Sequence, residues 1–224
     1  MDLPIGTFTN FNAFENCPHK FFQTYVLKSI PYVESPEMKW GNDVHSAMEN
    51  RIGKGTPLPE TMASAEPIAA MCASMPQNFT VRVEYRLAMT AQGQPCGWSG
   101  QGCWFRGKLD YTAMPPALDA AWMLDWKTGN VREDPLELET GALLLRVNHQ
   151  SVQHVEGEYF WMKAGQKGFR YTLNDPSSTF AWLQSRRAEM EKYHAAGDWP
   201  KRKNPLCGWC GVVSCEFNTS YKRK

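Results

Sequence analysis

Two segments of this chain hold the residue types best suited to chemistry. They are Gly107-Lys-Leu-Asp110 and, fifteen residues after Asp110, Asp125-Trp-Lys127-Thr-Gly129. Side chains alternate between the two faces of a strand, so Asp125 and Lys127 would point the same way, and pairing with a neighbouring strand would bring Asp110 beside them. Two carboxylates next to an ammonium can hold Mg²⁺ or Mn²⁺ with a water. This arrangement would serve metal-assisted hydrolysis of a phosphodiester.

A surface ion pair is the simpler interpretation of Asp125 and Lys127. However, the preceding Ala120-Ala-Trp-Met-Leu is an almost continuous apolar run, typical of a strand that is buried on both faces. Charged side chains at the end of such a strand are costly unless something pairs with them or uses them. The following Thr128-Gly129-Asn130 predicts a turn, which would place the charges where the strand leaves the core.

Length and composition favour a globular protein with one main domain. The 224 residues fit one α/β domain or one domain with a small appendage, and 42% hydrophobic residues suffice for a core. No apolar stretch approaches the length that spans a membrane. The N-terminus lacks a basic flank and an apolar signal core, so we expect a cytoplasmic location.

Positive charge gathers at the C-terminal end, although the whole chain carries only +1. Between Ala196 and Lys224 there are six basic residues and two acidic ones, a local charge of +4 against −3 for the rest. The basic residues are Lys201, Arg202, Lys203, Lys222, Arg223 and Lys224. Such a tail could contact phosphates or simply add solubility, and composition favours neither interpretation.

The seven cysteines point to a metal site or to buried thiols, because disulfides are rare in the cytosol. Cys72, Cys96 and Cys103 are expected to be buried thiols. The spacing C-x₂-C-x₄-C at Cys207, Cys210 and Cys215 instead suggests three ligands that need a fourth.

The local patterns predict helices, a three-stranded meander, a helix, two strands and a final helix. Helices are expected at residues 7–25, 35–55, 60–75, 136–148 and 175–196, and strands at 80–88, 103–111, 121–127, 155–162 and 169–173. This order predicts an α/β (α+β) fold with a central mixed β-sheet flanked by helices.

With these elements placed, the chain resembles the PD-(D/E)XK nucleases, and within them the RecB-like exonuclease branch. The motifs that carry the resemblance are, in chain order, Phe8-Thr-Asn-Phe, Cys17-Pro-His-Lys-Phe-Phe, Trp40-Gly41-Asn-Asp-Val44-His45, Glu84, Gly107-Lys-Leu-Asp110, Asp125-Trp-Lys127-Thr-Gly129 and Cys207-Gly-Trp-Cys210-Gly-Val-Val-Ser-Cys215. Each is weakly specific alone, but their shared order covers nearly the whole chain. The resemblance implies a restriction-endonuclease-like core.

The resemblance also implies roles for individual side chains. Asp110 and Asp125 would bind the divalent metal directly, with His45 as an additional ligand. Lys127 would orient the attacking water and offset charge on the phosphate. Glu84 would act on the metal indirectly, through the water molecules bound to it. The simpler interpretation of His45 is a histidine satisfied inside the fold, and that of Glu84 is a strand residue paired with a neighbouring arginine, Arg82 or Arg86.

One motif departs from the family pattern. In relatives, the K-T-G motif is followed by a helix that bears Q-x-x-x-Y. The spacing in this chain places Glu137 at the position of the glutamine and Gly141 at the position of the tyrosine. Those residues are thought to position DNA in relatives. The departure therefore keeps open a second interpretation, a nucleic-acid-binding module with weak or no catalysis. A third is a partner subunit of a recombinase or helicase.

For the cysteines, the resemblance implies a [4Fe–4S] cluster held by Cys17, Cys207, Cys210 and Cys215, with structural Zn²⁺ as the alternative. The site would join the N-terminal helix (residues 1–30) to the C-terminal segment (residues 200–224) of a single nuclease domain spanning residues 1–224. Trp209, inside the cysteine loop, is a candidate for a nucleic-acid contact.

Taken together, the motifs predict a Mg²⁺- or Mn²⁺-dependent deoxyribonuclease, an exonuclease acting on DNA ends or single strands. The resemblance implies a role in recombination, repair or DNA processing, in a phage or in CRISPR adaptation. A phage protein would work in the host cytoplasm. A recombinase, an annealing protein or a helicase would be a fitting partner, no membrane contact is expected, and an oligomer is compatible with the family.

Overall fold

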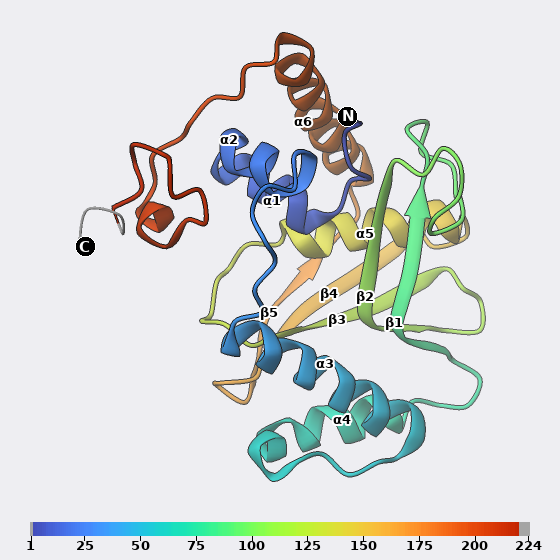
Figure 1. The fold of residues 1–224 in the computed structure, drawn as a ribbon. Coiled ribbons are helices and arrows are strands. Elements are labelled where there is room, and N and C mark those ends of the chain that lie inside the picture. The colour runs from blue at the N-terminus through green and yellow to red at the C-terminus, as the bar shows by residue number, and fades with distance from the viewer. Residues whose placement is uncertain (1, 220–224) are drawn as a thin grey trace. The chain divides into compact units, whose positions relative to one another are not determined.

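The computed structural model describes residues 2–219 (Figure 1). Lys222, Arg223 and Lys224 of the expected basic tail lie outside the described residues. The chain divides into two compact units, one spanning Glu34–Phe180 and the other combining the residues up to Val33 with those from Ala181 onward. The expectation of one nuclease domain across residues 1–224 stays a prediction. No helix within residues 2–219 is long and apolar enough to cross a membrane.

A five-stranded mixed sheet forms the centre of the larger unit. Its strands are β1 (Thr80–Met89), β2 (Phe105–Met114), β3 (Ala120–Lys127), β4 (His154–Trp161) and β5 (Gln166–Thr172), in the spatial order β1-β2-β3-β4-β5. Neighbours run antiparallel except β3 and β4, which are parallel. Parallel strands need a crossover, and helix α5 (Leu136–Asn148) provides it. The expected mixed sheet flanked by helices is confirmed.

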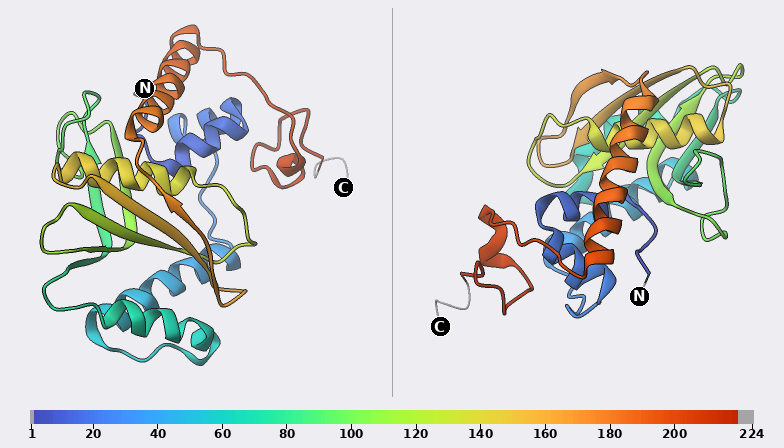
Figure 2. Two further views of the ribbon diagram at one scale, coloured as in Figure 1. Left: turned by 180° about the vertical axis from the view of Figure 1, so that it is seen from behind. Right: turned by 90° about the horizontal axis from the view of Figure 1, so that it is seen from above.

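Helices cover this sheet on both faces (Figures 1 and 2). Helix α3 (Pro36–Lys54) and helix α4 (Glu66–Ala73), which follows a 3₁₀ turn at Glu60–Ala65, pack on one face. Their apolar side chains share a buried cluster with the sheet, including Val44, Met48, Ile68, Tyr111 and Trp126. Ser35 caps α3 by accepting a hydrogen bond from the backbone N–H of Met38, which fixes where this helix begins.

Helix α5 packs on the opposite face and approaches the sheet closely at two glycines. A Cβ atom at Gly141 would lie 2.6 Å from Met123 Cε and 2.9 Å from Leu109 Cδ2. A Cβ atom at Gly107 of β2 would lie 2.8 Å from Leu144 Cδ1 of α5. Both strand-side neighbours of Gly141 are buried, so the interface has no room for a larger residue there.

The smaller unit is helical and rich in aromatic contacts. Its helices are α1 (Phe8–Asn16), α2 (Pro18–Phe21), a π-helical turn at Phe22–Val26, the part of α6 (Pro176–Ala196) from Ala181 onward, and a 3₁₀ turn at Pro205–Trp209. Phe14 and Phe21 are buried and contact the ring of Trp199. Thr7 and Asn10 cap α1 reciprocally, each side chain accepting a hydrogen bond from the backbone N–H of the other residue.

The helix expected to run without a break over residues 7–25 is interrupted at Cys17. Its backbone is extended, with φ −166° and ψ 108°. Pro18 explains the break, because proline disfavours the helical conformation in the residue before it. Three cysteines outside the cluster were expected to be buried thiols. This is right for Cys72, but Cys96 and Cys103 are only half-buried.

Candidate active site

Strands β2 and β3 place two of the predicted acidic residues side by side. Tyr111 pairs with Leu124 in the antiparallel ladder, so Asp110 and Asp125 are the next residues along their strands. The Asp110 carboxylate is buried, and its Oδ2 accepts a hydrogen bond from the backbone N–H of Trp126 at 2.8 Å. This bond fixes the Asp110 side chain against the end of β3.

Three side chains, Asp110 among them, form a group with the geometry of a metal site. Ligand atoms of His45, Glu84 and Asp110 lie within 4.8 Å of one another. His45 Nδ1 is 2.9 Å from Glu84 Oε1 and 3.3 Å from Asp110 Oδ1. Helix α3 supplies the imidazole and strands β1 and β2 supply the carboxylates. Two carboxylates and one imidazole suit Mn²⁺, and Mg²⁺ with additional waters.

Glu84 has an unusual backbone for a strand residue. Its φ is +52°, while its neighbours Val83 and Tyr85 keep their pairing with β2. The left-handed region costs a non-glycine residue about 1 kcal/mol, and such strain concentrates at functional sites. The Glu84 carboxylate forms ion pairs with His45 and Lys108, rather than with either neighbouring arginine of β1.

The electrostatics of this group favour a cation at its centre. Burial alone would lower the pKa of His45, but the hydrogen bonds that its imidazole donates to the Asp110 and Glu84 carboxylates raise it to about 10. Burial alone would raise the pKa of Glu84, but His45 and Lys108 hold it below its usual range. The Glu84 carboxylate therefore stays charged beside the imidazole, and a divalent ion bound here would replace the proton that His45 otherwise carries.

Lys127 ends β3 between two carboxylates. Its Nζ lies 2.6 Å from Asp125 Oδ2 and 2.5 Å from Glu137 Oε2, and it sits over the ring of Tyr159 at 5.3 Å. Burial alone would lower the pKa of Lys127, but Asp125 and Glu137 raise it, so the ammonium is retained. Burial raises the pKa of Asp125 strongly, the Lys127 charge opposes this, and Asp110 and Glu137 add to it.

The structure thus separates the predicted residues into two adjacent sets. His45, Glu84 and Asp110 form the metal-type group, whereas the Asp125 carboxylate is directed at Lys127 and is not part of that group. Glu84 was expected to have only an indirect role, and no local pattern in the sequence reveals its left-handed backbone.

Helix α5 carries the two residues, Glu137 and Gly141, that depart from the family's Q-x-x-x-Y pattern. Glu137 stands in the first turn of α5, where its carboxylate pairs with the Lys127 ammonium. Gly141 stands one turn later, at the closest approach of α5 to β2 and β3. A tyrosine at this position would collide with Met123 and Leu109, so this chain replaces the usual motif by an ion pair and a close helix–sheet contact.

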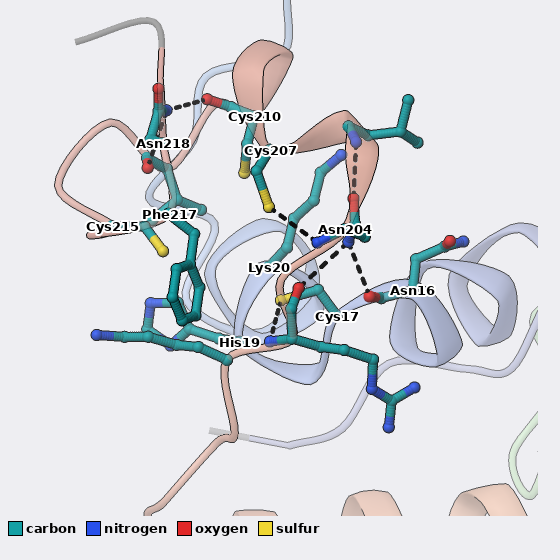
Figure 3. A pocket seen from close by; sticks show the side chains of 14 residues that line it. Asn16, Cys17, His19, Lys20, Asn204, Cys207, Cys210, Cys215, Phe217 and Asn218 are labelled. Atoms are coloured by element: carbon teal, nitrogen blue, oxygen red, sulfur yellow. Dashed lines mark hydrogen bonds between the residues drawn. The ribbon is translucent and has the colours of Figure 1, made fainter. Parts of the chain in front are cut away.

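A second candidate centre lies in the helical unit. Cys17, Cys207, Cys210 and Cys215 line one pocket, and Figure 3 shows their side chains around it. Two of the sulfurs accept backbone hydrogen bonds: Cys17 from Arg202 at 3.4 Å and Cys207 from Asn204 at 3.4 Å. Lys20, Lys201 and Arg202 also line the pocket, and these positive charges suit an anionic thiolate site.

A twisted mixed sheet with helices on both faces and clustered carboxylates beside a lysine defines a restriction-endonuclease-like core. The sequence matches the PD-(D/E)XK nuclease superfamily over residues 7–215, and the chain belongs to this family. Membership implies a metal-dependent nuclease, and the His45, Glu84 and Asp110 group is a fitting place for the divalent metal.

Among the solved structures that share the fold, two are similar over most of their length. The protein SSO0001 is 14% identical, with 96% of this chain and 87% of that chain covered and a TM-score of 0.53. A protein described as an exonuclease candidate, from Eubacterium rectale, is 10% identical, with the same coverages of 96% and 87% and a TM-score of 0.55. At these identities the likeness concerns the fold alone. No curated protein matches the sequence.

Proposed function

We propose that this protein is a DNA exonuclease of the RecB-like branch that hydrolyses phosphodiester bonds with Mg²⁺ or Mn²⁺. The observation that carries the proposal is the His45–Glu84–Asp110 group, built beside the half-buried Lys127–Asp125 ion pair. In a nuclease family, this combination supplies both a metal-binding group and a positive charge for the phosphate.

The metal-binding group would consist of His45, Glu84 and Asp110, with Asp125 of the neighbouring strand as a further carboxylate. A divalent ion held there would lower the pKa of a water molecule and offset the charge that builds on the phosphate. The hydrogen bond from Trp126 to Asp110 keeps that carboxylate in place before substrate binds. Such preorganisation reduces the reorganisation that the reaction requires.

Lys127 would act as a fixed positive charge. Its raised pKa keeps the ammonium protonated at neutral pH, so it is suited to donate hydrogen bonds to the water or to a phosphate oxygen. It is poorly suited to accept a proton. Asp125 and Glu137 hold its position, so Glu137 would be a positioning residue in place of the missing glutamine.

For the cysteine pocket, we propose a [4Fe–4S] cluster bound by Cys17, Cys207, Cys210 and Cys215. Zn–S distances of about 2.3 Å place tetrahedral sulfurs about 3.8 Å apart. No three of these cysteine sulfurs, all within residues 2–219, form a group within 4.8 Å. This wider spread supports the larger cluster over zinc. The cluster would join α1–α2 to the C-terminal segment and have a structural role.

The cluster proposal has a direct spectroscopic test. Anaerobically purified protein should be brown, with charge-transfer absorbance that disappears in the Cys17→Ser variant. Colourless protein that contains stoichiometric zinc would show that the alternative is correct.

The biological setting proposed is DNA recombination, repair or processing, with DNA ends or single strands as substrates. A recombinase, an annealing protein or a helicase would be the partner, and the cytoplasm would be the location. These assignments rest on the RecB-like resemblance.

The nuclease proposal is tested with linear, circular and single-stranded DNA under Mg²⁺ or Mn²⁺. We expect loss of nucleotides from linear ends, abolished by chelation and in Asp110→Asn and Lys127→Met. Equal digestion by the wild type and both variants would refute the assignment.

A further inference from the structure

The β1–β2 hairpin has a charge composition that the active site does not explain. Residues 85–109 contain no aspartate or glutamate but include Arg86, Arg106 and Lys108. This segment of the hairpin therefore carries +3 in a chain whose total is +1, which leaves −2 for all other residues. A stretch of 25 residues without one acid, in a chain with 23 acidic residues, is suited to an anionic ligand.

The three cations lie on one face of the hairpin. Arg86 is directly opposite Lys108 in the antiparallel ladder, and Arg106, two residues before Lys108, is opposite Ala88. Directly opposed residues and residues two apart share a face. The other face is buried, with Leu87 and Leu109 among its residues and α5 packed against both strands. The cations therefore form a row, which we call the hairpin track.

One end of the hairpin track meets the metal-type group. The Lys108 ammonium forms an ion pair with the Glu84 carboxylate, while 43% of the Lys108 side chain stays exposed. An anionic chain bound along the track would thus lead to His45, Glu84 and Asp110.

The hairpin loop arranges the two guanidinium groups. Trp98 lies over both of them, with its ring centroid 4.7 Å from Arg106 Cζ and 5.6 Å from Arg86 Cζ. Arg106 Nη1 also donates a hydrogen bond to the Trp98 backbone oxygen at 2.8 Å. Neither arginine forms an ion pair with a carboxylate among the described residues. Their charge is therefore ordered but not neutralised, which lowers the entropy lost on binding a ligand.

We propose that the hairpin track binds consecutive backbone phosphates of the DNA strand that enters the active site. The inference rests on the proposed function and adds the path of the substrate. A row of three cations suits a polyanion better than a single small anion, and guanidinium groups match phosphate geometry. Trp98 positions the arginines rather than reading bases, so the track is independent of sequence.

The test measures DNA binding without cleavage. A fluorescein-labelled single-stranded oligonucleotide is titrated by anisotropy in EDTA, from about 50 to about 200 mM salt. Each lost phosphate contact lowers the steepness of log K against log salt by about 0.7 for single strands. Arg86→Ala/Arg106→Ala should therefore lose about 1.4 of the slope and bind roughly tenfold more weakly at low salt.

Two comparison variants make the result specific. Arg86→Lys/Arg106→Lys keeps the charge and should recover the wild-type slope. Lys163→Ala removes an exposed cation from the turn after β4 and should bind like the wild type. A wild-type salt slope in the double alanine variant would overturn the proposed track. An equal loss of slope in Lys163→Ala would overturn it as well. Thermal unfolding and Mn²⁺ binding establish that each variant is folded.

The binding experiment and the cleavage experiment test the track and the nuclease proposal separately. The same oligonucleotide with Mg²⁺ or Mn²⁺ reports cleavage by the wild type. Binding through the track without cleavage would refute the nuclease assignment alone. Cleavage by a wild type whose salt slope is unaffected by the arginine substitutions would refute the track alone.

Discussion

Lys127 Nζ lies 2.5 Å from Glu137 Oε2, which connects the end of β3 to the first turn of α5. The family pattern has a neutral glutamine at this position, and here a carboxylate takes its place. Lys127 consequently has two anionic partners, Asp125 and Glu137, which hold its ammonium at the end of β3.

Glu137→Ala should lower kcat about tenfold with little change in KM, because the Lys127 ammonium would lose one of the two partners that position it. Glu137→Gln retains a hydrogen-bond acceptor and should recover most of the rate. Glu139→Gln, on the same turn of α5, is the matched control. If the three variants have the same steady-state parameters, the ion pair has no positioning role.

Lys127→Met should abolish cleavage and destabilise the fold by about 3 kcal/mol, because it leaves the Asp125 carboxylate buried without its cation. Asp125 protonates more readily in this variant, so the deficit should shrink as the pH falls. Asp125→Asn/Lys127→Met should recover stability but not activity. Urea unfolding of the single and double variants measures this coupling, and additive losses would contradict it.

Gly141→Ala should destabilise the protein by about 1 to 2 kcal/mol, although alanine is the better helix former. The added Cβ would press on Met123 and Leu109 under α5. Gly53→Ala in α3, with no atom within 4 Å of the added Cβ, should stabilise the protein by up to about 1 kcal/mol. Thermal unfolding compares the two, and a stabilising Gly141→Ala would contradict the close helix–sheet contact.

His149 should make the fold less stable in acid. Burial and the charge of Arg82 lower its pKa, and its Nε2 lies 2.9 Å from the Tyr85 hydroxyl. The unfolded chain binds the proton more tightly, so this contribution is complete above the ordinary histidine pKa of about 6.5 and is lost as pH falls through the lower folded value. His149→Gln should flatten the pH dependence of unfolding between about pH 5 and about pH 7. An unchanged profile would show that another group is responsible.

Much of the architecture could be read from the sequence because local patterns and tertiary packing agree. The apolar run before Asp125 became a buried strand, and α5 has the bounds that its pattern predicts. The break at Cys17 was missed, although Pro18 gave a usable signal. The left-handed Glu84 backbone was not readable, because the partners of its side chain, His45 and Lys108, are distant from it in the sequence.

In the site too, local patterns predict some features, whereas others depend on contacts between residues distant in the sequence. Alternation along β3 correctly placed Asp125 beside Lys127, but it could not say whether Asp125 faces the metal group or the lysine. The hairpin track was also overlooked, since its charge is evident only when the acid-free stretch and the Trp98 contacts are considered together.

The most direct measurement is anomalous diffraction from crystals equilibrated with Mn²⁺. We predict a peak at ligand distance from His45 Nδ1 and from the carboxylate oxygens of Glu84 and Asp110, absent in Asp110→Asn crystals. An ordered group of these three side chains without a peak, or a peak that persists in Asp110→Asn, would contradict the proposed metal site and the nuclease mechanism built on it.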